Sequence, residues 1–298
     1  MDYITKPQPM TTENQRKMIF SLQDAYPALR VRTVGRSLCD RPIYALEIGR
    51  SADPLLIAGG THGQEWLTCL LALRFAEALL RAQAENGLLW LAQGRSVTRS
   101  VLIVPCVNPD GVEIALRGPE AAGDYAPLVA SLLAGSPDDW NANARGVDIN
   151  HNFDANWEAL RELEIDSGIT GPAPRRYGGA TPESEPETQA MVALCNARLP
   201  RMLIALHSQG REIFWRYSER LPPDSRALAE LFSAASGYKL SDNAGLASFG
   251  GFKDWFIAAF NKPGYTVEIG VGRNPLPLTD FPQIWTETLP LLTLTSIL

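Results

Sequence analysis

Two apolar stretches indicate the fold class: residues 54–60, PLLIAGG, and residues 100–111, SVLIVPCVNPDG. Both contain continuous rather than alternating apolar runs, which is typical of strands covered by helices on both faces. The segment between them, residues 66–85 (WLTCLLALRFAEALLRAQAE), is predicted to form a long helix. This strand, helix, strand order predicts an α/β fold with a mixed, mostly parallel sheet sandwiched by helices.

The rest of the chain extends this pattern with further strands and helices. Strands are predicted at 201–210 (RMLIALHSQG), 212–217 (EIFWRY) and 264–270 (GYTVEIG), and helices at 184–199, 225–237 and 250–260. No repeat, low-complexity tract or linker divides the sequence. We therefore expect residues 1–298 to form a single domain.

The N-terminal region predicts a helix followed by a hairpin. Thr12 stands three residues before Gln15, as in a capping box, and the helix is expected to end near Tyr26 and Pro27. The strand-like runs LRVRTVG (29–35) and PIYALEIG (42–49) follow, joined by a short turn. We expect them to form a hairpin at a sheet edge.

Composition excludes several classes of partner. The chain has 298 residues, 45% of them hydrophobic, which is enough for a large core. Its net charge is -6 and its pI is about 5.2. Lys and Arg form no extended cluster, so nucleic acid and anionic membrane surfaces are poor partners.

The cysteines and the N-terminus predict a cytoplasmic location. The four cysteines are widely spaced, and none belongs to a CxxC pair: Cys39, Cys69, Cys106 and Cys195. Buried free thiols suit a reducing compartment. Residues 1–17 lack the apolar segment of a secretory signal, and no run is long enough to cross a bilayer.

Two of the three histidines follow predicted strands. His62 comes after PLLIAGGT and His207 after RMLIAL, and Glu65 lies three residues beyond His62. In open α/β sheets, ligands bind beyond the carboxyl ends of the strands. Two imidazoles and one carboxylate are a standard catalytic zinc set. An isolated HxxE is often a chance match, but His207 at a second strand end strengthens the prediction of one zinc ion per chain.

Glu268, at the end of GYTVEIG, is a candidate for proton transfer. Zinc makes water a useful nucleophile near neutral pH, but amide hydrolysis also needs a group that carries the proton to the leaving amine. A carboxylate within an apolar strand end is costly to bury unpaired, so it should open on a cavity or have a polar partner. A solvent-facing Glu on an edge strand is the alternative.

Taken in order, THGQE, NPDG, RGVDINHNFDANW, LHSQG, GGFKDW and TVEIG resemble the zinc metallocarboxypeptidases, the carboxypeptidase A-like family. The resemblance spans residues 43 to 280. RPIYALEIG, ALHSQG, GGFKDWFI and EIGVGRNPLP are most similar to the bacterial branch that cleaves γ-D-glutamyl to diamino acid bonds in cell-wall peptides. It implies a single α/β domain with a mixed sheet of about eight strands.

The resemblance implies a role for each matching residue. His62, Glu65 and His207 would bind zinc, and Glu268 would act as general base and then as general acid. Arg145, in NARGVD, would polarise the scissile carbonyl and stabilise the oxyanion, which is a suitable role for a guanidinium. Without the neighbouring motif, Arg145 would be interpreted as a surface residue of a polar loop.

Substrate binding is implied for Asn150, and here the sequence departs from the family. The family usually places an arginine after this asparagine to hold a terminal carboxylate, and this chain has His151. A permanently charged fork is thus replaced by a ring whose charge depends on pH. Leu246 occupies the position where the family often has a substrate-closing tyrosine, and we do not assign that role to the nearby Tyr238.

Lys253 matches the base of the family's specificity pocket. A lysine there favours a substrate side chain that ends in a carboxylate, as diaminopimelate does. A solvated lysine on an amphipathic helix is an equal alternative. Arg211, Arg216 and Arg273 are further candidates for the same role.

Together these features predict a zinc metallopeptidase that hydrolyses small muropeptide-derived peptides, at a γ-D-glutamyl to diaminopimelate or similar bond. Two alternatives remain open. One is an ordinary carboxypeptidase that removes α-linked C-terminal residues, against which His151 and Leu246 count. The other is a non-catalytic zinc module that binds peptides, against which Glu268 and Arg145 count.

Overall fold

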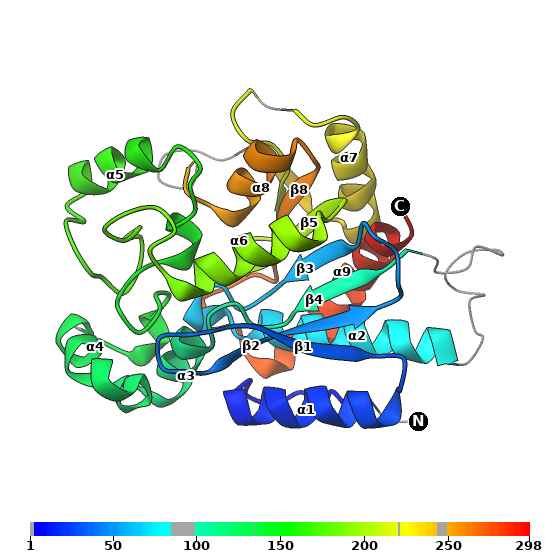
Figure 1. Ribbon diagram of the computed structural model, residues 1–298, viewed down its shortest axis with the longest axis horizontal. Helices are drawn as coiled ribbons and strands as arrows, with labels where there is room; N and C mark the ends of the chain where they lie inside the picture. Colours follow the sequence, from blue (N-terminus) through cyan, green and yellow to red (C-terminus); the bar gives the residue numbers. More distant parts are fainter. Residues whose placement is uncertain (1–2, 85–98, 134, 220, 243–248) are drawn as a thin grey trace.

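A mixed sheet runs through the centre of the computed structural model, which describes residues 3–84, 99–133, 135–219, 221–242 and 249–298 (Figure 1). Within these residues the sheet has eight strands in the order β1-β2-β4-β3-β5-β8-β6-β7. The strands are β1 (Arg30–Arg36), β2 (Pro42–Ile48), β3 (Leu55–Ala58), β4 (Val101–Val104), β5 (Met202–Ser208), β6 (Glu212–Phe214), β7 (Lys239–Ser241) and β8 (Gly264–Ile269).

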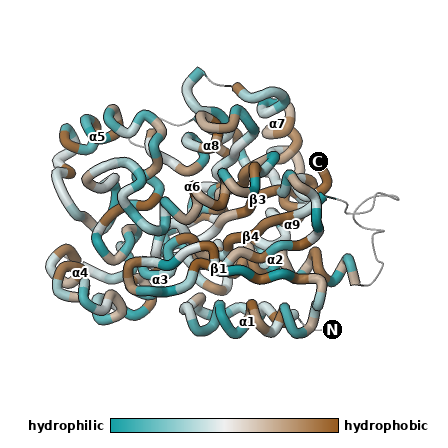
Figure 2. The backbone as a smooth tube through the Cα atoms, viewed as in Figure 1, coloured by the Kyte–Doolittle hydropathy of each residue, from teal (hydrophilic) through white to brown (hydrophobic). Residues whose placement is uncertain are grey.

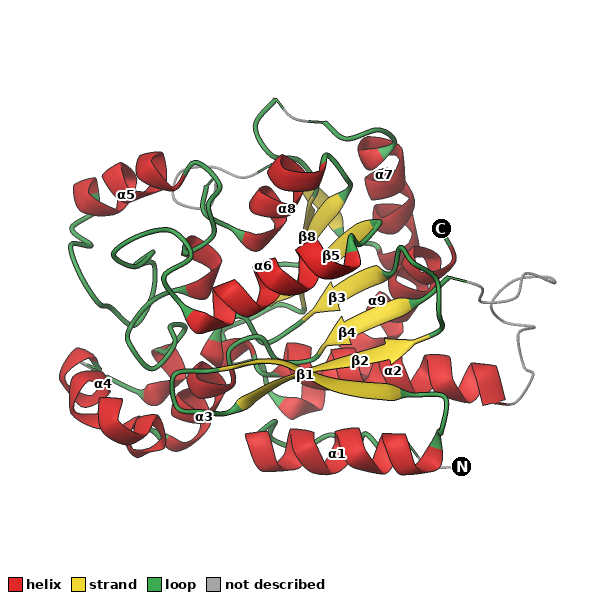
Figure 3. Cartoon of the chain, in the orientation of Figure 1, coloured by secondary structure: helices red, strands yellow, loops and turns green. Residues whose placement is uncertain are grey.

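Helices lie on both faces of this sheet (Figure 3). They are α1 (Thr12–Ala25), α2 (Leu67–Ala84), α3 (Pro109–Arg117), α4 (Ala126–Leu132), α5 (Trp157–Asp166), α6 (Pro186–Arg198), α7 (Ser225–Ser236), α8 (Phe252–Phe260) and α9 (Phe281–Ile297). The expected α/β fold with a mixed sheet of about eight strands, sandwiched by helices, is confirmed.

Strand β3 shows why both faces must be covered. All four of its residues are fully buried. Leu55 and Ile57 belong to the apolar cluster that includes α2 and α9, whereas Leu56 and Ala58 belong to the cluster that includes α6 and α8. Successive side chains of a strand point to opposite faces, so a continuous apolar run feeds two cores. Figure 2 shows hydrophobic segments along β3, β4 and α9.

The four central strands β4, β3, β5 and β8 are parallel to one another. Their carboxyl ends therefore meet at one edge of the sheet, which is where polar residues from distant parts of the sequence come together. Antiparallel pairs flank this centre at β1–β2, β2–β4 and β6–β8. The hairpin expected at a sheet edge is confirmed as β1–β2.

Some local predictions need correction. The first residue of α1 is Thr12, but the residue that caps it is Thr11, whose hydroxyl accepts the Asn14 N–H. Gln15 does not close a capping box, because its side-chain amide donates to the carbonyl of Met10. The strand predicted at 212–217 is limited to β6, Glu212–Phe214.

Two further features bear on the sequence predictions: the state of the cysteines and the length and apolar character of the helices. All four cysteines are free, and Cys69, Cys106 and Cys195 are buried as predicted. None of the helices in the described ranges combines the length and the apolar character that a bilayer crossing requires.

Candidate metal centre and active-site pocket

The loop after β3 carries His62 and Glu65, and glycines allow its sharp path. Gly60 has φ +60°, and a Cβ there would lie 2.5 Å from the Cys69 Sγ. A Cβ at Gly63 would collide with the carbonyl oxygens of Gly111 and Trp140. Both positions therefore favour glycine, which turns the chain into the short 3₁₀ helix η1 (Gly63–Glu65) directly after His62.

Asn108, from the NPDG motif, holds this loop in place. It is fully buried. Its side-chain amide donates to the carbonyls of Thr61 and Ala142, both at 3.1 Å, and its carboxamide oxygen accepts the Gly111 N–H that opens α3. One asparagine thereby joins the ends of β3 and β4 to the loop around residue 142.

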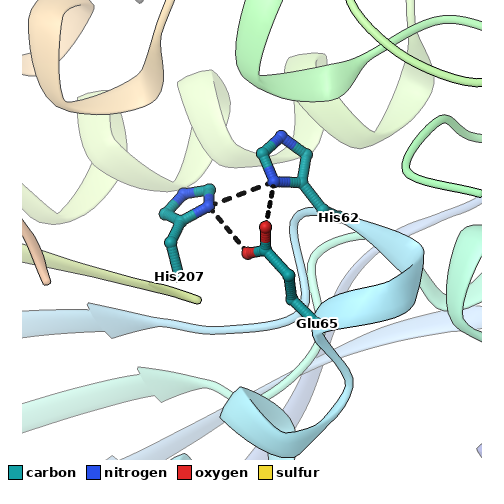
Figure 4. A group of neighbouring side chains, drawn as sticks. All are labelled: His62, Glu65 and His207. Carbon is teal, nitrogen blue, oxygen red and sulfur yellow. Dashed lines mark hydrogen bonds and ion pairs between the residues drawn. The ribbon is translucent and has the colours of Figure 1, made fainter. Parts of the chain in front are cut away.

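His62, Glu65 and His207 converge on one point (Figure 4). The Glu65 carboxylate spans the two rings, with Oε1 2.8 Å from the His62 Nδ1 and Oε2 3.0 Å from the His207 Nδ1. The two Nδ1 atoms are 3.3 Å apart. The predicted ligands are thus brought together from the β3 loop and the end of β5, although 145 positions separate the two histidines.

This geometry fits a zinc ion. Donor atoms that each lie about 2.0–2.2 Å from a tetrahedral zinc are roughly 3.3 Å apart, close to the separations between these donor atoms. The chemistry of the set, two imidazole nitrogens and one carboxylate, suits zinc better than calcium or magnesium, which prefer oxygen ligands. Only three protein ligands converge in the described structure, which is the pattern of catalytic rather than structural zinc sites.

Charge is concentrated at this point. Burial favours neutral groups, but the attraction of His62 and His207 outweighs it and holds the pKa of Glu65 well below its ordinary value. Burial likewise lowers the pKa of His62, and the charges of Glu65 and Asp148 raise it well above the usual range. The three side chains therefore have strong electrostatic coupling, as expected of groups that a cation would organise.

Asp148 orients the ring of His62 through the nitrogen that does not face Glu65, a role that sequence reasoning missed. Its Oδ1 lies 3.1 Å from the His62 Nε2, and its Oδ2 accepts the backbone N–H of Arg176 at 2.8 Å. Burial would raise the pKa of Asp148, but the charges of His62 and His151 hold it well below its ordinary value. Carboxylates in this position fix the orientation of a metal-binding imidazole.

Glu268 faces the same pocket from β8. It is half-buried, and its carboxylate makes no hydrogen bond within the described residues. Burial and repulsion by Glu65 and Glu212 raise its pKa well above the ordinary value, despite the opposing effect of His62. A carboxylate with a raised pKa is well suited to accept and return a proton near neutral pH.

His62, Asp148, His207 and Glu268 line a pocket of about 250 Å³. Its lining includes most of the predicted site residues together with polar and aromatic side chains from distant parts of the sequence. The lining residues are His62, Asn141, Asp148, Asn150, His151, Arg175, Arg176, His207, Phe214, Phe249, Gly251, Lys253, Asp254, Thr266 and Glu268.

Asn150 and His151 reach the pocket with one end of each side chain already fixed. The Asn150 carboxamide oxygen accepts the Phe252 N–H at 3.0 Å, which leaves its NH₂ group available to an acceptor. The His151 Nδ1 is 3.0 Å from the fully buried Glu164, whose other oxygen is 2.6 Å from Arg161. Glu164 therefore fixes the ring that stands where the family has arginine.

Lys253 lines the pocket, but its charge is already compensated. The side chain is 3% exposed, so the alternative of a solvated lysine is wrong. Its ammonium donates to the carboxylate of Asp254 and, at 2.6 Å, to the carbonyl of Arg216. A substrate carboxylate would therefore compete with Asp254 for this group.

Arg145 is not brought to the pocket lining. Its guanidinium binds the buried Glu185 at 3.0 Å, and its backbone N–H donates to the Asn143 side chain. The pairing with Glu185 counts against the oxyanion role that the resemblance implies for Arg145, and that role stays a prediction. Arg175 and Arg176, which sequence reasoning missed, are the arginines in the lining.

The other described residues considered for substrate binding are not among the residues that line the pocket. Arg211 pairs with Glu287, Arg216 with Asp242 and Arg273 with Asp139. Tyr238 is buried, and its hydroxyl contacts Glu287 rather than the pocket. Leu246 lies outside the described residues.

Two known proteins are similar to this chain over more than half of its length. Gamma-D-glutamyl-L-diamino acid endopeptidase 1 of Lysinibacillus sphaericus is 37% identical over 91% of this chain and 68% of its own length. Murein peptide amidase A of Escherichia coli is 31% identical over 58% of this chain and 57% of its own length.

Solved structures share the fold. Bovine thrombin-activatable fibrinolysis inhibitor matches with a TM-score of 0.72 and 21% identity, over 99% of this chain and 97% of that chain. Murein-tripeptide amidase from E. coli O157 matches with a TM-score of 0.53 and 24% identity, over 89% and 91% of the two chains.

A family model described as zinc carboxypeptidase matches residues 16–291. That range contains every residue of the metal centre and of the pocket described above. The donor set and its spacing independently fit the metal that the family name specifies. The chain therefore belongs to the zinc carboxypeptidase family and is a metallopeptidase.

Proposed function

We propose that this metallopeptidase cleaves small cell-wall-derived peptides at the bond between a γ-D-glutamyl residue and a diamino acid such as diaminopimelate. The observation that carries the proposal is one pocket lined by His62, His207 and Glu268, in which Glu65 joins the two histidines in a group that could hold a metal ion. The 37% identical relative, an endopeptidase named for this bond, supports the choice of substrate.

The metal ligands in this proposal are His62, Glu65 and His207. Zinc held there supplies Lewis acidity, which activates water and polarises a carbonyl. Glu268 takes the proton of the attacking water and returns it to the leaving nitrogen. Its raised pKa suits both steps, because a strongly acidic carboxylate would be a poor base near neutral pH.

Asn150 and His151 would hold a carboxylate on the leaving side. Asn150 offers its free NH₂ group, and His151 offers the nitrogen that does not face Glu164. Neither is a permanently charged fork, so a free terminal carboxylate is gripped less firmly than by arginine. This favours cleavage within a short peptide over strict removal of one C-terminal residue.

The proposal also includes the size of the substrate and the cellular location of the protein. The substrate is a small peptide, since the pocket measures about 250 Å³. The location we propose is cytoplasmic, because the four free thiols suit a reducing compartment.

One assay tests the function. Purified protein with equimolar zinc is incubated with L-Ala-γ-D-Glu-diaminopimelate, and the products are identified by mass spectrometry. Release of free diaminopimelate supports the proposal, and absence of turnover refutes this substrate. Matched α-linked peptides, with and without C-terminal amidation, separate an ordinary carboxypeptidase, which loses activity when the terminus is blocked. Binding without hydrolysis would indicate a non-catalytic module.

A further inference from the structure

Among the residues that the structure describes, Arg176 is the cation of the pocket that has no partner. Its guanidinium makes no hydrogen bond or ion pair within the described residues, and the residue is exposed. The other cations of the lining are engaged: Lys253 with Asp254, and Arg175 with the backbone carbonyl and, at 3.5 Å, the carboxylate of Asp139. An unpaired guanidinium beside a substrate pocket is suited to bind an anionic group of the substrate.

The backbone of Arg176 is tied to the metal centre. Its N–H donates to Asp148 Oδ2 at 2.8 Å, and Asp148 Oδ1 contacts the ring of His62. Asp148 also donates its own N–H to the carbonyl of Tyr177 at 2.7 Å. The base of the Arg176 side chain is therefore fixed relative to a proposed zinc ligand, although it lies in a loop.

Arg176 also adopts a left-handed backbone, with φ +66°. This conformation is uncommon for a residue other than glycine and is energetically unfavourable. Contacts of the next two residues maintain this backbone conformation. The Tyr177 ring packs under Arg161, whose guanidinium is 5.0 Å from the ring centroid. The carbonyl of Gly178 accepts hydrogen bonds from the side chains of Asn152 and Trp157. The structure thus holds Arg176 in an orientation that an unconstrained loop would not favour.

A γ-linked glutamyl residue has a free α-carboxylate, whereas the α-carboxyl group of an α-linked residue is consumed in the peptide bond. The γ-linked bond is made through the side chain instead. The intervening side-chain carbons separate this carboxylate from the scissile carbonyl, so it needs a partner away from the metal. Asn150 and His151 are already proposed for the leaving side, which leaves Arg176 for the acyl side.

We infer that Arg176 binds the free α-carboxylate of the γ-glutamyl residue and thereby selects γ-linked over α-linked substrates. This inference rests on the proposed function and names a specificity-determining residue within it.

The test compares the wild type and Arg176 variants on two peptides that differ only in the glutamyl α-carboxylate. L-Ala-γ-D-Glu-diaminopimelate is compared with the same peptide in which the glutamyl α-carboxylate is a carboxamide. For the wild type we expect kcat/KM to be about 10- to 100-fold higher on the carboxylate, the range of a hydrogen-bonded charge. Arg176→Gln should abolish most of this preference, with turnover of the amidated peptide unchanged.

Two matched variants serve as controls. Arg176→Lys keeps the charge without the fork and should retain part of the preference. Arg175→Gln removes a neighbouring arginine that is already engaged and should leave the preference as in the wild type.

Three other outcomes would contradict the inference. If Arg176→Gln slows both substrates equally or slows neither, the inference is wrong while the proposed function stands. If its effect follows amidation of a diaminopimelate carboxylate instead, Arg176 binds the leaving side and the inference is again wrong. If the wild type cleaves neither peptide, the proposed function itself fails, and the inference fails with it.

Discussion

His207 and Glu268 are direct register partners on the neighbouring parallel strands β5 and β8. Partners in adjacent strands present their side chains to the same face of the sheet, and both residues line the same pocket. On its other side Glu268 is paired with Glu212 of β6. Backbone hydrogen bonds therefore fix the spacing between a proposed zinc ligand and the proposed base.

Glu268→Gln should stop turnover without removing the metal. We expect kcat/KM to fall by about 10²- to 10⁴-fold, the usual contribution of a positioned base. The zinc content should stay at one per chain, because Glu268 is not among the three converging ligands. Steady-state kinetics and elemental analysis of the same preparation check this. Full zinc with full activity would remove Glu268 from the mechanism.

Asp148→Asn should weaken zinc binding although Asp148 is not a proposed ligand. The change removes the negative charge behind His62, and loss of such a partner costs about 10- to 100-fold in metal affinity. Competition with a zinc chelator measures it. Glu164→Gln is the matched control, since that carboxylate is also buried and faces a histidine, but the histidine is His151. Equal losses in both variants would indicate a general packing effect.

Arg145→Gln should affect stability more than catalysis. Arg145 binds the buried Glu185, so its loss leaves a charge less well paired, at a cost of about 1–3 kcal/mol of unfolding free energy. Because Arg145 does not line the pocket, kcat should change by less than about threefold. Urea unfolding and kinetics measure the two effects. A fall in kcat of about 100-fold would restore the oxyanion role.

The predictable part of this site is the part built on strands. His62, His207 and Glu268 were placed together because buried parallel strands must end at a common edge, which periodicity reveals. Glu65 followed from its spacing to His62. Where the backbone of a regular sheet sets a position, the sequence pattern is sufficient to predict it.

The less predictable part depends on loops and on long-range partners. Arg145 was assigned by motif, but its partner Glu185 lies 40 residues away, and nothing in the pattern indicates that pairing. Asp148 and Arg176 meet across a loop, at a separation of 28 residues. Lys253 pairs with Asp254, its neighbour in the sequence, and the pattern does not indicate this pairing because adjacent helix residues usually face apart.

Glu187 is predicted to make stability depend on pH. It is fully buried beside Asp110 and Glu185, and burial and these charges raise its pKa to about 8. In the unfolded chain its pKa is near the ordinary value of about 4.3. Between these two values the folded state holds a proton that the unfolded state has lost, so unfolding free energy falls as pH rises through this window.

Glu187→Gln should remove this loss, because a carboxamide resembles the protonated acid and cannot ionise. Relative to the wild type, the variant should gain on the order of a few kcal/mol between pH 6 and pH 9, measured by urea unfolding at a fixed zinc concentration. Glu47→Gln is the opposite control: Arg198 and Arg30 pair with Glu47 and lower its pKa, so this variant should lose stability at both pH values. A Glu187→Gln variant whose stability parallels that of the wild type across this range would show that the Glu187 carboxylate is already ionised at pH 6.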